Sequence, residues 1–361
     1  MTPTRTLHDL GQSLWLDNIT RDLLTGGGLA AHIAERDVTG LTSNPTIFEQ
    51  AVGSSDAYDA SIQASMAQGR DGEGAFFDLA VEDIRAAADL FAPVHERTDG
   101  VDGFVSLEVS PLLARDADAT LAQAKELHAR VGRPNLFIKI PGTPEGLPAI
   151  EEAIFAGIPV NVTLLFDRDQ YLAAADAYLR GIERRVAAGL NPHVPSVASI
   201  FVSRWDVAVR DRTPEEGLRN RLGIAIMQQA YVAYLELLAS PRWQRLANAG
   251  ARPQRALWAS TGTKDPEASD TLYIDALASP LTVNTMPEKT LLAFADHGRV
   301  AAPLARDGGD SAEVIAAFEG AGVDVGALAR QLQEQGADAF VASWHKLLEQ
   351  IAAKGATLAA S

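Results

Sequence analysis

A single lysine inside an apolar run is the residue of this sequence best suited to covalent chemistry. The run at 135–143, NLFIKIPGT, carries Lys139 between Ile138 and Ile140. Desolvation lowers the pKa of a lysine because it disfavours the charged form, and a partly neutral amine is a nucleophile toward carbonyl carbons. Lys139 could therefore form a Schiff base. The alternative is that Lys139 extends along its apolar neighbours to solvent at the end of a strand.

Two carboxylic acids lie near the ends of other apolar runs and could move protons. Asp17 closes the run SLWLD at 13–17, and Glu108 lies near the end of GFVSLEV at 103–109. A carboxylate beside an iminium ion can take the hydroxyl proton that is released when a carbon–carbon bond breaks. Both acids also have structural alternatives. Asp17 could cap the helix that follows it, and Glu108 could form a buried salt bridge with Lys139.

Further polar residues lie late in the other apolar runs or directly after them. They are Asn44, Asn161, Thr163, Ser199 and Arg204. Amides suit a neutral polyol, and an arginine offers bidentate geometry to a phosphate. Asn161 and Thr163 are two positions apart on one expected strand, so their side chains point to the same side. Each of the five also has an ordinary alternative as a turn residue, a core hydroxyl or a surface arginine at a helix start.

Eight short apolar runs alternate with longer helical patterns, and these runs must position the polar residues. The runs have the length and composition of buried strands and lack the 3.6-residue period of helices. The expected strands are 13–17, 38–43, 103–109, 135–143, 158–166, 194–202, 255–261 and 281–285. The expected helices include 76–94, 118–131 with Asp118 as its cap, 144–156, 167–188 and 215–238.

Strands that alternate with helices predict a parallel sheet, and eight of them predict a closed (β/α)8 barrel, the TIM barrel, with additional helices. A doubly wound open sheet is the alternative. A chain of 361 residues can form one such barrel domain over 1–361, with a C-terminal helix at about 312–356 packed on it. Because barrel active sites are built at the C-terminal ends of the strands, we expect the polar residues to converge on one mouth.

Composition excludes several other kinds of site. The net charge is −16 and no cluster of basic residues stands out, which argues against nucleic acid or an anionic membrane as a partner. There is no cysteine, and the histidines lack metal-ligand spacing, so neither a metal nor another cofactor is expected. The N-terminus has no apolar signal core, and no run has the length of a membrane span. We expect a cytoplasmic protein that binds small molecules, and a homo-oligomer is compatible with this sequence.

Five separated motifs resemble those of the transaldolase family of the pentose phosphate pathway. They are LTSNPTIF, VSLEVSP, NLFIKIPGT, PVNVTLLF and ASIFVSRWD, in this order. The similarity extends from about Leu14 to Pro287 and recurs more weakly at 340–351. It implies a barrel enzyme that transfers a dihydroxyacetone unit between sugar phosphates. The donor would be sedoheptulose 7-phosphate or fructose 6-phosphate, and the acceptor would be glyceraldehyde 3-phosphate or erythrose 4-phosphate.

The resemblance also implies a role for each matched residue. Lys139, on the fourth strand, would form the Schiff base, and Asp17 would shuttle protons to and from the substrate hydroxyl. Glu108 and Thr163 would hold the water used to form and resolve the carbinolamine. Arg204 would clamp the phosphate. The residues that would bind hydroxyl groups of the substrate are Asn44, Asn161 and Ser199.

One stretch departs from the family pattern. Family members commonly offer an arginine after the seventh strand as a second phosphate contact, whereas this chain reads ASTGTKDP at 259–266. We predict that Lys264, together with Ser260, takes that role.

Two other functions remain open. One is a related aldolase that releases free dihydroxyacetone, as the small fructose 6-phosphate aldolases do. Those enzymes typically carry glutamine where this chain has Glu108 and tyrosine where it has Phe201, so both residues favour transfer. The other is a sugar-phosphate-binding protein without catalysis. The lysine and the two carboxylates argue against it, because binding alone needs no desolvated amine.

Overall fold

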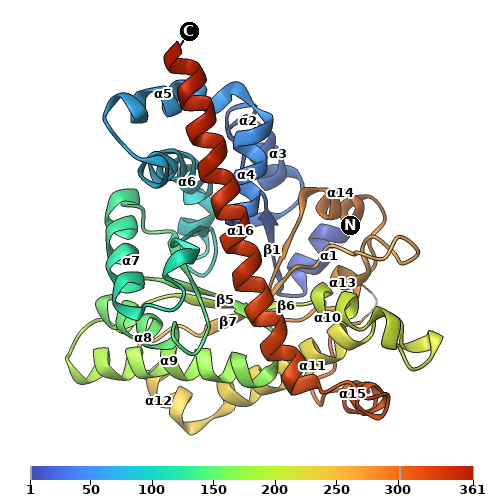
Figure 1. The fold of residues 1–361 in the computed structure, drawn as a ribbon. Helices are drawn as coiled ribbons and strands as arrows, with labels where there is room; N and C mark the ends of the chain where they lie inside the picture. Colours follow the sequence, from blue (N-terminus) through green and yellow to red (C-terminus); the bar gives the residue numbers. More distant parts are fainter. Residues whose placement is uncertain (1, 301, 361) are drawn as a thin grey trace.

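Eight parallel strands form a closed barrel, which confirms the expected (β/α)8 architecture and shows that the open-sheet alternative is wrong (Figure 1). This computed structural model describes residues 2–300 and 302–360. The strands follow the order of the chain around the barrel, and β8 pairs with β1. They are β1 Ser13–Asp17, β2 Val38–Thr42, β3 Val105–Glu108, β4 Leu136–Pro141, β5 Val160–Leu165, β6 Ser196–Phe201, β7 Gln254–Ala259 and β8 Val283–Met286.

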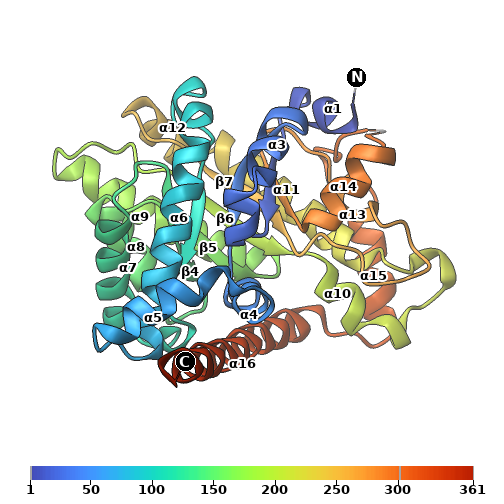
Figure 2. The same ribbon diagram turned by 90° about the horizontal axis from the view of Figure 1, so that it is seen from above.

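Helices surround the barrel and extend it at both ends. They are α1 Pro3–Asp9, α2 Arg21–Thr25, α3 Gly28–Glu35, α4 Pro45–Ser54, α5 Asp59–Ala67, α6 Gly72–Arg97, α7 Ala117–Val131, α8 Leu147–Ala156, α9 Arg168–Ala187, α10 Ser203–Ala208, α11 Leu222–Ala239, α12 Pro241–Asn248, α13 Leu272–Ala276, α14 Glu288–His297, α15 Ser311–Gly320 and α16 Val325–Ala360. The longest of these, α16, lies across the side of the barrel on which the strands end (Figures 1 and 2).

Several element ends differ from the sequence prediction. Apart from β1 and the start of β2, the strand ends differ from their expected positions by one or two residues. The helix expected at 215–238 begins only at Leu222, because a 3-10 turn precedes it and Asn220 has a φ of 59°. The C-terminal helix expected at about 312–356 is two helices, α15 and α16, and Gly322 between them has a φ of 85°.

The cap expected for the helix at 118–131 is wrong, and so is the alternative in which Asp17 caps the helix that follows it. Helix α7 is capped by Asp116 and not by Asp118: the Asp116 carboxylate accepts a hydrogen bond from the backbone N–H of Ala119. Helix α2 is capped by Thr20, whose hydroxyl accepts the N–H of Leu23, so Asp17 does not cap it. The Asp17 carboxylate is thereby left for other contacts.

Helix α11 is the one helix in the described part of the chain that is long and apolar enough to cross a membrane. Just over half of its residues are buried inside the protein, where it packs against α9, α12 and α15. The core helix of a water-soluble protein has the same length and composition, so this helix is weak evidence for a membrane span.

An aromatic layer crosses the inside of the barrel below its C-terminal mouth. Trp15 lies two residues before Asp17 on β1, and Phe137 lies two residues before Lys139 on β4, so each pair shares one side of its strand. The Phe137 ring stacks on Phe104 at 4.1 Å between centroids and lies 6.1 Å from the Trp15 ring. Strand β2 makes room for the indole with Gly40, where an added Cβ would lie 2.5 Å from indole atoms. This layer lies between the C-terminal mouth and the N-terminal end of the barrel.

Candidate active site

A cavity of about 340 Å³ opens at the C-terminal ends of the strands. Of the ten site residues expected from the sequence, all except Glu108 and Asn161 line it, and these two contact lining residues. The expected residues in the lining are Asp17, Asn44, Lys139, Thr163, Ser199, Arg204, Ser260 and Lys264. Among the described residues, no group of three or more histidine, cysteine and acidic side chains could hold a metal ion.

Lys139 is buried in the lining of this cavity and does not extend to solvent. Its side chain is 5% exposed, and its ammonium nitrogen donates a hydrogen bond of 3.0 Å to the backbone carbonyl of Ser43. The same nitrogen lies 3.1 Å from a carboxylate oxygen of Glu108, its neighbour in the β3–β4 register. The expected position on the fourth strand is confirmed, and so is the salt bridge considered as an alternative role for Glu108.

Glu108 is buried as deeply as its partner, with a side chain that is 4% exposed. Burial raises the pKa of Glu108, and the neighbouring ammonium of Lys139 lowers it in part. The ion pair lacks hydrogen-bond geometry, so neither carboxylate oxygen has a hydrogen-bond partner among the described residues. The hydroxyl of Thr163 on β5 is likewise buried without a partner in this part of the chain. Buried polar groups of this kind usually bind ordered water or a ligand.

Asp17 faces the cavity from the end of β1 and accepts a hydrogen bond of 2.7 Å from the Thr42 hydroxyl. Burial raises the pKa of Asp17, whereas the charge of Lys139, the Thr42 hydroxyl and the charge of Lys264 lower it. A carboxylate with these opposed influences can exchange a proton with a substrate hydroxyl. Thr42 was not among the expected site residues, because one threonine in a buried strand carries no distinctive signal.

Replacing Thr42 with valine tests the link between this hydroxyl and the acid. The substitution removes a donor that stabilises the charged carboxylate, so the pKa of Asp17 rises and the acidic limb of the pH–rate profile moves to higher pH. We expect the loss of activity relative to wild type to be roughly tenfold greater at pH 6 than at pH 8. Thr285→Val is the control: it removes a hydroxyl that is hydrogen-bonded to Thr42 and lines the same cavity. This variant should leave the pH–rate profile at the same pH as in wild type. Equal losses at both pH values would contradict the link.

Three polar residues form a hydrogen-bonded chain that begins at Ser199 in the cavity lining. The Ser199 hydroxyl donates a hydrogen bond of 2.7 Å to the side-chain oxygen of Asn161. The side-chain nitrogen of Asn161 donates in turn to the Ser106 hydroxyl at 3.1 Å. Asn161 is the second residue of β5 and pairs with Lys139 in the register, so it lies one layer below Thr163. The expectation that every site residue lies late in its strand is therefore wrong for Asn161.

Asn44 combines a structural contact with a place in the cavity lining. It caps α4, and its side-chain oxygen accepts the N–H of Ile47 at 3.1 Å. Asn44 therefore has the structural role at a turn that was considered as its alternative. Its amide nitrogen donates no hydrogen bond to a residue that the structure describes, so it can donate one to a ligand.

Two cations reach the cavity from separate loops. Arg204 is the second residue of α10, and burial lowers its pKa. Its guanidinium lies 5.4 Å from the ring centroid of Phe201. Lys264 reaches the cavity from the loop after β7, near Ser260, whose hydroxyl is hydrogen-bonded to Ser203 at 2.9 Å. Neither cation forms an ion pair with an acid in the described part of the chain, so both can bind an anion.

Helix α16 forms the roof of this cavity. The Gln333 amide donates hydrogen bonds to the backbone carbonyls of Gly142 and Leu164, at 3.1 and 2.9 Å. One turn further, Gly336 faces Arg204, and Phe340 places its ring 5.6 Å from the Lys139 ammonium. The spacing of 333, 336 and 340 puts all three on one helix face. Sequence reasoning missed them because a buried helix of any function has this spacing.

Gly336→Ala tests whether the roof positions Arg204. An added Cβ would lie 3.1 Å from a guanidinium nitrogen of Arg204 and 2.9 Å from a methyl of Leu164, so one of these must move. We expect the KM for the substrate of this cavity to rise about tenfold, since a displaced binding group holds its ligand less well. Gly326→Ala, in the first turn of the same helix, meets only atoms at 3.7 Å or more and serves as the control. An equal KM for both variants would show that α16 does not position Arg204.

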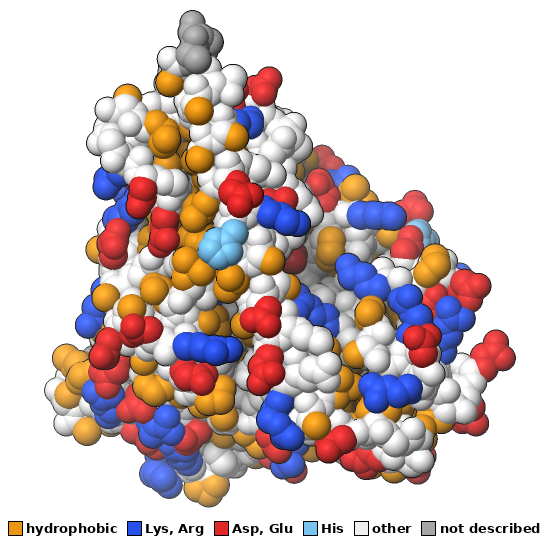
Figure 3. All heavy atoms as spheres, in the orientation of Figure 1, with side chains coloured by type: hydrophobic (Ala, Val, Ile, Leu, Met, Phe, Trp, Pro, Cys, Tyr) orange, Lys and Arg blue, Asp and Glu red, His pale blue; other side chains and the backbone are white. Residues whose placement is uncertain are grey.

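The surface around the cavity suits an anionic ligand despite the net negative charge of the chain. Basic and acidic side chains are interspersed over the face that α16 crosses, and several basic side chains surround a hollow beside this helix (Figure 3). Local positive charge of this kind attracts phosphorylated molecules.

The family model and three relatives that match this chain all have transaldolase in their descriptions. A family model described as transaldolase/fructose-6-phosphate aldolase matches residues 14–351. A *Thermobifida fusca* protein named transaldolase is 49% identical, over 97% of this chain and 98% of its own length. A *Frankia alni* protein of the same name is 47% identical, over 97% of this chain and 96% of its own. A third, from *Thiobacillus denitrificans*, is 44% identical over 97% of this chain and all of its own length.

Proposed function

The chain belongs to the transaldolase/fructose-6-phosphate aldolase family, and we infer that it is a transaldolase, a transferase that acts on sugar phosphates. The observation that carries this conclusion is the 49% identity with a protein named transaldolase over nearly the full length of both chains. A transaldolase moves a dihydroxyacetone unit from a ketose phosphate to an aldose phosphate, as the pentose shunt requires. We also propose a cytoplasmic location, because charged sugar phosphates do not cross membranes freely.

We propose that Lys139 forms the covalent intermediate. Its amine attacks C2 of the ketose, the carbinolamine loses water, and a protonated imine results. The amine must first lose a proton, and Glu108, 3.1 Å away with a pKa raised by burial, is close enough to accept it. Neither the Glu108 oxygens nor the Thr163 hydroxyl makes a hydrogen bond to a described residue, which supports a role in holding the water that leaves and later returns.

Asp17 is the proposed proton shuttle. It takes the proton of the C4 hydroxyl as the C3–C4 bond breaks, and the electron pair of that bond moves into the imine to give an enamine. The first aldose phosphate leaves with C4 as its aldehyde carbon. The enamine carbon then attacks the aldehyde of the second aldose phosphate, and Asp17 returns the proton to the new hydroxyl. Water finally releases the product ketose from Lys139.

The remaining residues are proposed to bind the substrate. Asn44, Asn161 and Ser199 would hold hydroxyl groups of the dihydroxyacetone unit. Asn44 and Ser199 offer neutral polar groups in the cavity lining, and Asn161 lies behind Ser199 and accepts its hydrogen bond. Arg204 and Lys264 would bind the phosphate, with Ser260 as an additional donor, since neither cation is neutralised by a described acid.

Glyceraldehyde 3-phosphate release from fructose 6-phosphate tests the transferase activity against the aldolase alternative. A coupled reduction assay would follow this release with and without erythrose 4-phosphate, in the absence of added metal. We expect release only when the acceptor is present, with sedoheptulose 7-phosphate as the second product. Steady release without acceptor would mean an aldolase. No release under either condition would overturn both activities.

A further inference from the structure

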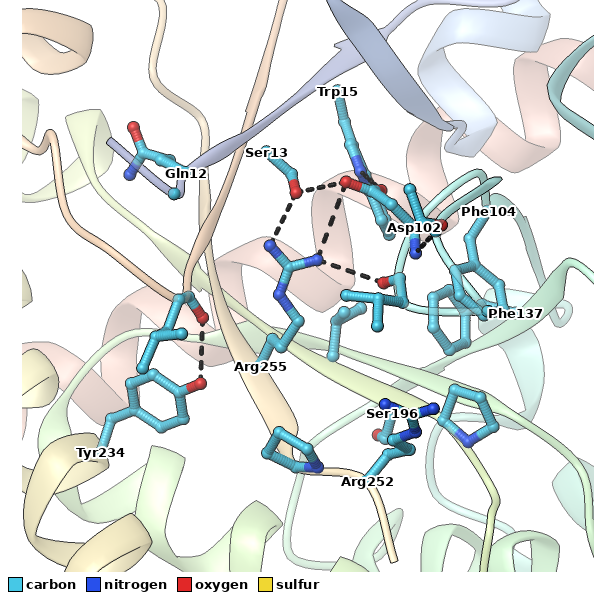
Figure 4. Close-up of a pocket in the computed structure, with 18 of the residues that line it drawn as sticks. Gln12, Ser13, Trp15, Asp102, Phe104, Phe137, Ser196, Tyr234, Arg252 and Arg255 are labelled. Carbon is cyan, nitrogen blue, oxygen red and sulfur yellow. Dashed lines mark hydrogen bonds and ion pairs between the residues drawn. The ribbon is translucent and has the colours of Figure 1, made fainter. Parts of the chain in front are cut away.

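A second cavity, of about 380 Å³, lies at the N-terminal end of the barrel, where Ser13, Ser196 and Arg255 at the starts of their strands line it (Figure 4). Most of its lining is apolar or aromatic, and the lining side chains include Trp15, Phe104, Phe137, Val197, Tyr234 and Leu238. In most barrels side chains fill this region, and an unfilled apolar cavity reduces stability. A volume of this size is typical of small-molecule sites.

One guanidinium group extends into this cavity from β7. The side chain of Arg255 is 12% exposed, and Figure 4 shows it among the labelled lining residues. Its hydrogen bonds go to neutral oxygens: 2.7 Å to the Ser13 hydroxyl, 2.7 Å to the carbonyl of Thr282 and 3.4 Å to that of Val101. A buried charge is costly unless a counter-ion pairs with it.

The carboxylate nearest this guanidinium accepts its hydrogen bonds from other groups. Asp102 forms a long ion pair with Arg255, at 3.9 Å, which Figure 4 draws and which exceeds hydrogen-bond distance. Its oxygens accept hydrogen bonds from the Trp15 indole at 2.7 Å and the Thr39 hydroxyl at 2.8 Å, and also from Ser13. Among the described residues, Arg255 therefore has no carboxylate hydrogen-bonded to it.

A second arginine lies at the rim of the same cavity, in the loop before β7. Arg252 donates from one terminal nitrogen to Asp99, whose own side chain is 93% exposed. The rest of its guanidinium donates no hydrogen bond to a described residue. Two guanidinium groups thus border a cavity whose lining is mostly apolar and also includes Asp102, Gln12 and Ser13.

We propose that this cavity is a second binding site, for a small amphiphilic carboxylate. Its apolar body would pack against Phe137, Val197 and Leu238, and its carboxylate would pair with Arg255, assisted by Arg252. A planar carboxylate matches the donor geometry of a guanidinium, and the apolar lining excludes strongly hydrated anions. The site shares no lining residue with the catalytic mouth.

The proposal can be tested by titration calorimetry on the full chain with four probes: phenylacetate, 3-phenylpropionate, 4-phenylbutyrate and octanoate. We expect at least one to bind with a stoichiometry of one, about tenfold or more tighter than its neutral amide. Arg255→Met should remove this preference for the acid, and Arg255→Lys should restore part of it. Saturable binding of none of the four, or equal affinity for acid and amide, would overturn the proposal.

Two further variants locate the site independently of Arg255, which could also matter for folding. Leu238→Trp fills the cavity and should weaken binding of acid and amide alike by at least about tenfold. Arg204→Met removes a cation of the catalytic mouth and should leave binding of the probe unchanged. Binding that survives Leu238→Trp, or that is lost in Arg204→Met, would place the probe elsewhere and overturn the proposal.

Discussion

Lys139→Met should lower transaldolase turnover by about 10⁴-fold or more, since it removes the nucleophile on which every later step depends. It should also abolish the adduct that borohydride traps with fructose 6-phosphate. Mass spectrometry of the trapped protein checks both the loss and the position of the adduct in wild type. A trapped adduct on any other lysine would refute the proposed role of Lys139.

The same substitution should change the dependence of stability on pH. It leaves Glu108 buried without its cation, and breaking a buried ion pair costs about 3–5 kcal/mol when the remaining charge persists. Burial already raises the pKa of Glu108, and the loss of Lys139, which lowers that pKa, raises it further. The folded variant therefore retains a proton that the unfolded chain loses above about pH 4.3. Its stability relative to wild type is highest at acidic pH and falls as the pH rises.

Urea denaturation of both proteins at pH 5 and pH 8 measures this effect. The double variant Lys139→Met/Glu108→Gln removes the isolated charge, so it should recover stability at pH 8 without recovering activity. A single variant that is equally destabilised at both pH values would show that Glu108 does not take up the proton.

Most of the fold could be predicted from the sequence because its strands are buried. Strands covered on both faces appear as continuous apolar runs, so a polar residue within such a run is conspicuous. Lys139 and Glu108 were identified in this way, and their adjacency in the β3–β4 register explains why both are tolerated in the core. Helix starts were less predictable: Asp116 and Asp118 are both reasonable caps for α7, and only the hydrogen bond to Ala119 distinguishes them.

Contacts made by distant parts of the chain were not predictable. Gln333 and Phe340 are ordinary members of an amphipathic helix, and their place over the mouth depends on how α16 crosses the barrel. Thr42 reaches Asp17 only because β1 and β2 pair in one register. The cavity at the N-terminal end exists because the side chains around it leave space unfilled. The sequence alone does not show how well side chains pack.

The confirmed salt bridge does not argue against catalysis by Lys139. The ion pair keeps the Lys139 nitrogen beside a base. Because burial raises the pKa of Glu108, transfer of the proton from nitrogen to carboxylate removes two buried charges at once. The pair that holds Lys139 in the core can thus also release it as a nucleophile.

Asp17→Asn should separate carbon–carbon bond cleavage from imine formation. The amide keeps the volume of the side chain and an oxygen that can accept the Thr42 hydrogen bond, but it cannot take the proton of the C4 hydroxyl. We expect kcat to fall by about 10²–10⁴-fold, the usual contribution of a general base. The rate at which borohydride traps the Lys139 adduct should fall far less, because the amine and its partner Glu108 are intact.

Single-turnover measurements decide between the two steps. Rapid mixing with fructose 6-phosphate followed by borohydride gives the rate of imine formation, and glyceraldehyde 3-phosphate release from the same samples gives the rate of cleavage. Asp22→Asn changes an exposed acid on α2 and should leave both rates unchanged. If Asp17→Asn slows trapping and cleavage by the same factor, Asp17 acts before the imine exists and is not the proton shuttle. If cleavage alone slows, the carboxylate at the end of β1 is the group that takes the C4 hydroxyl proton.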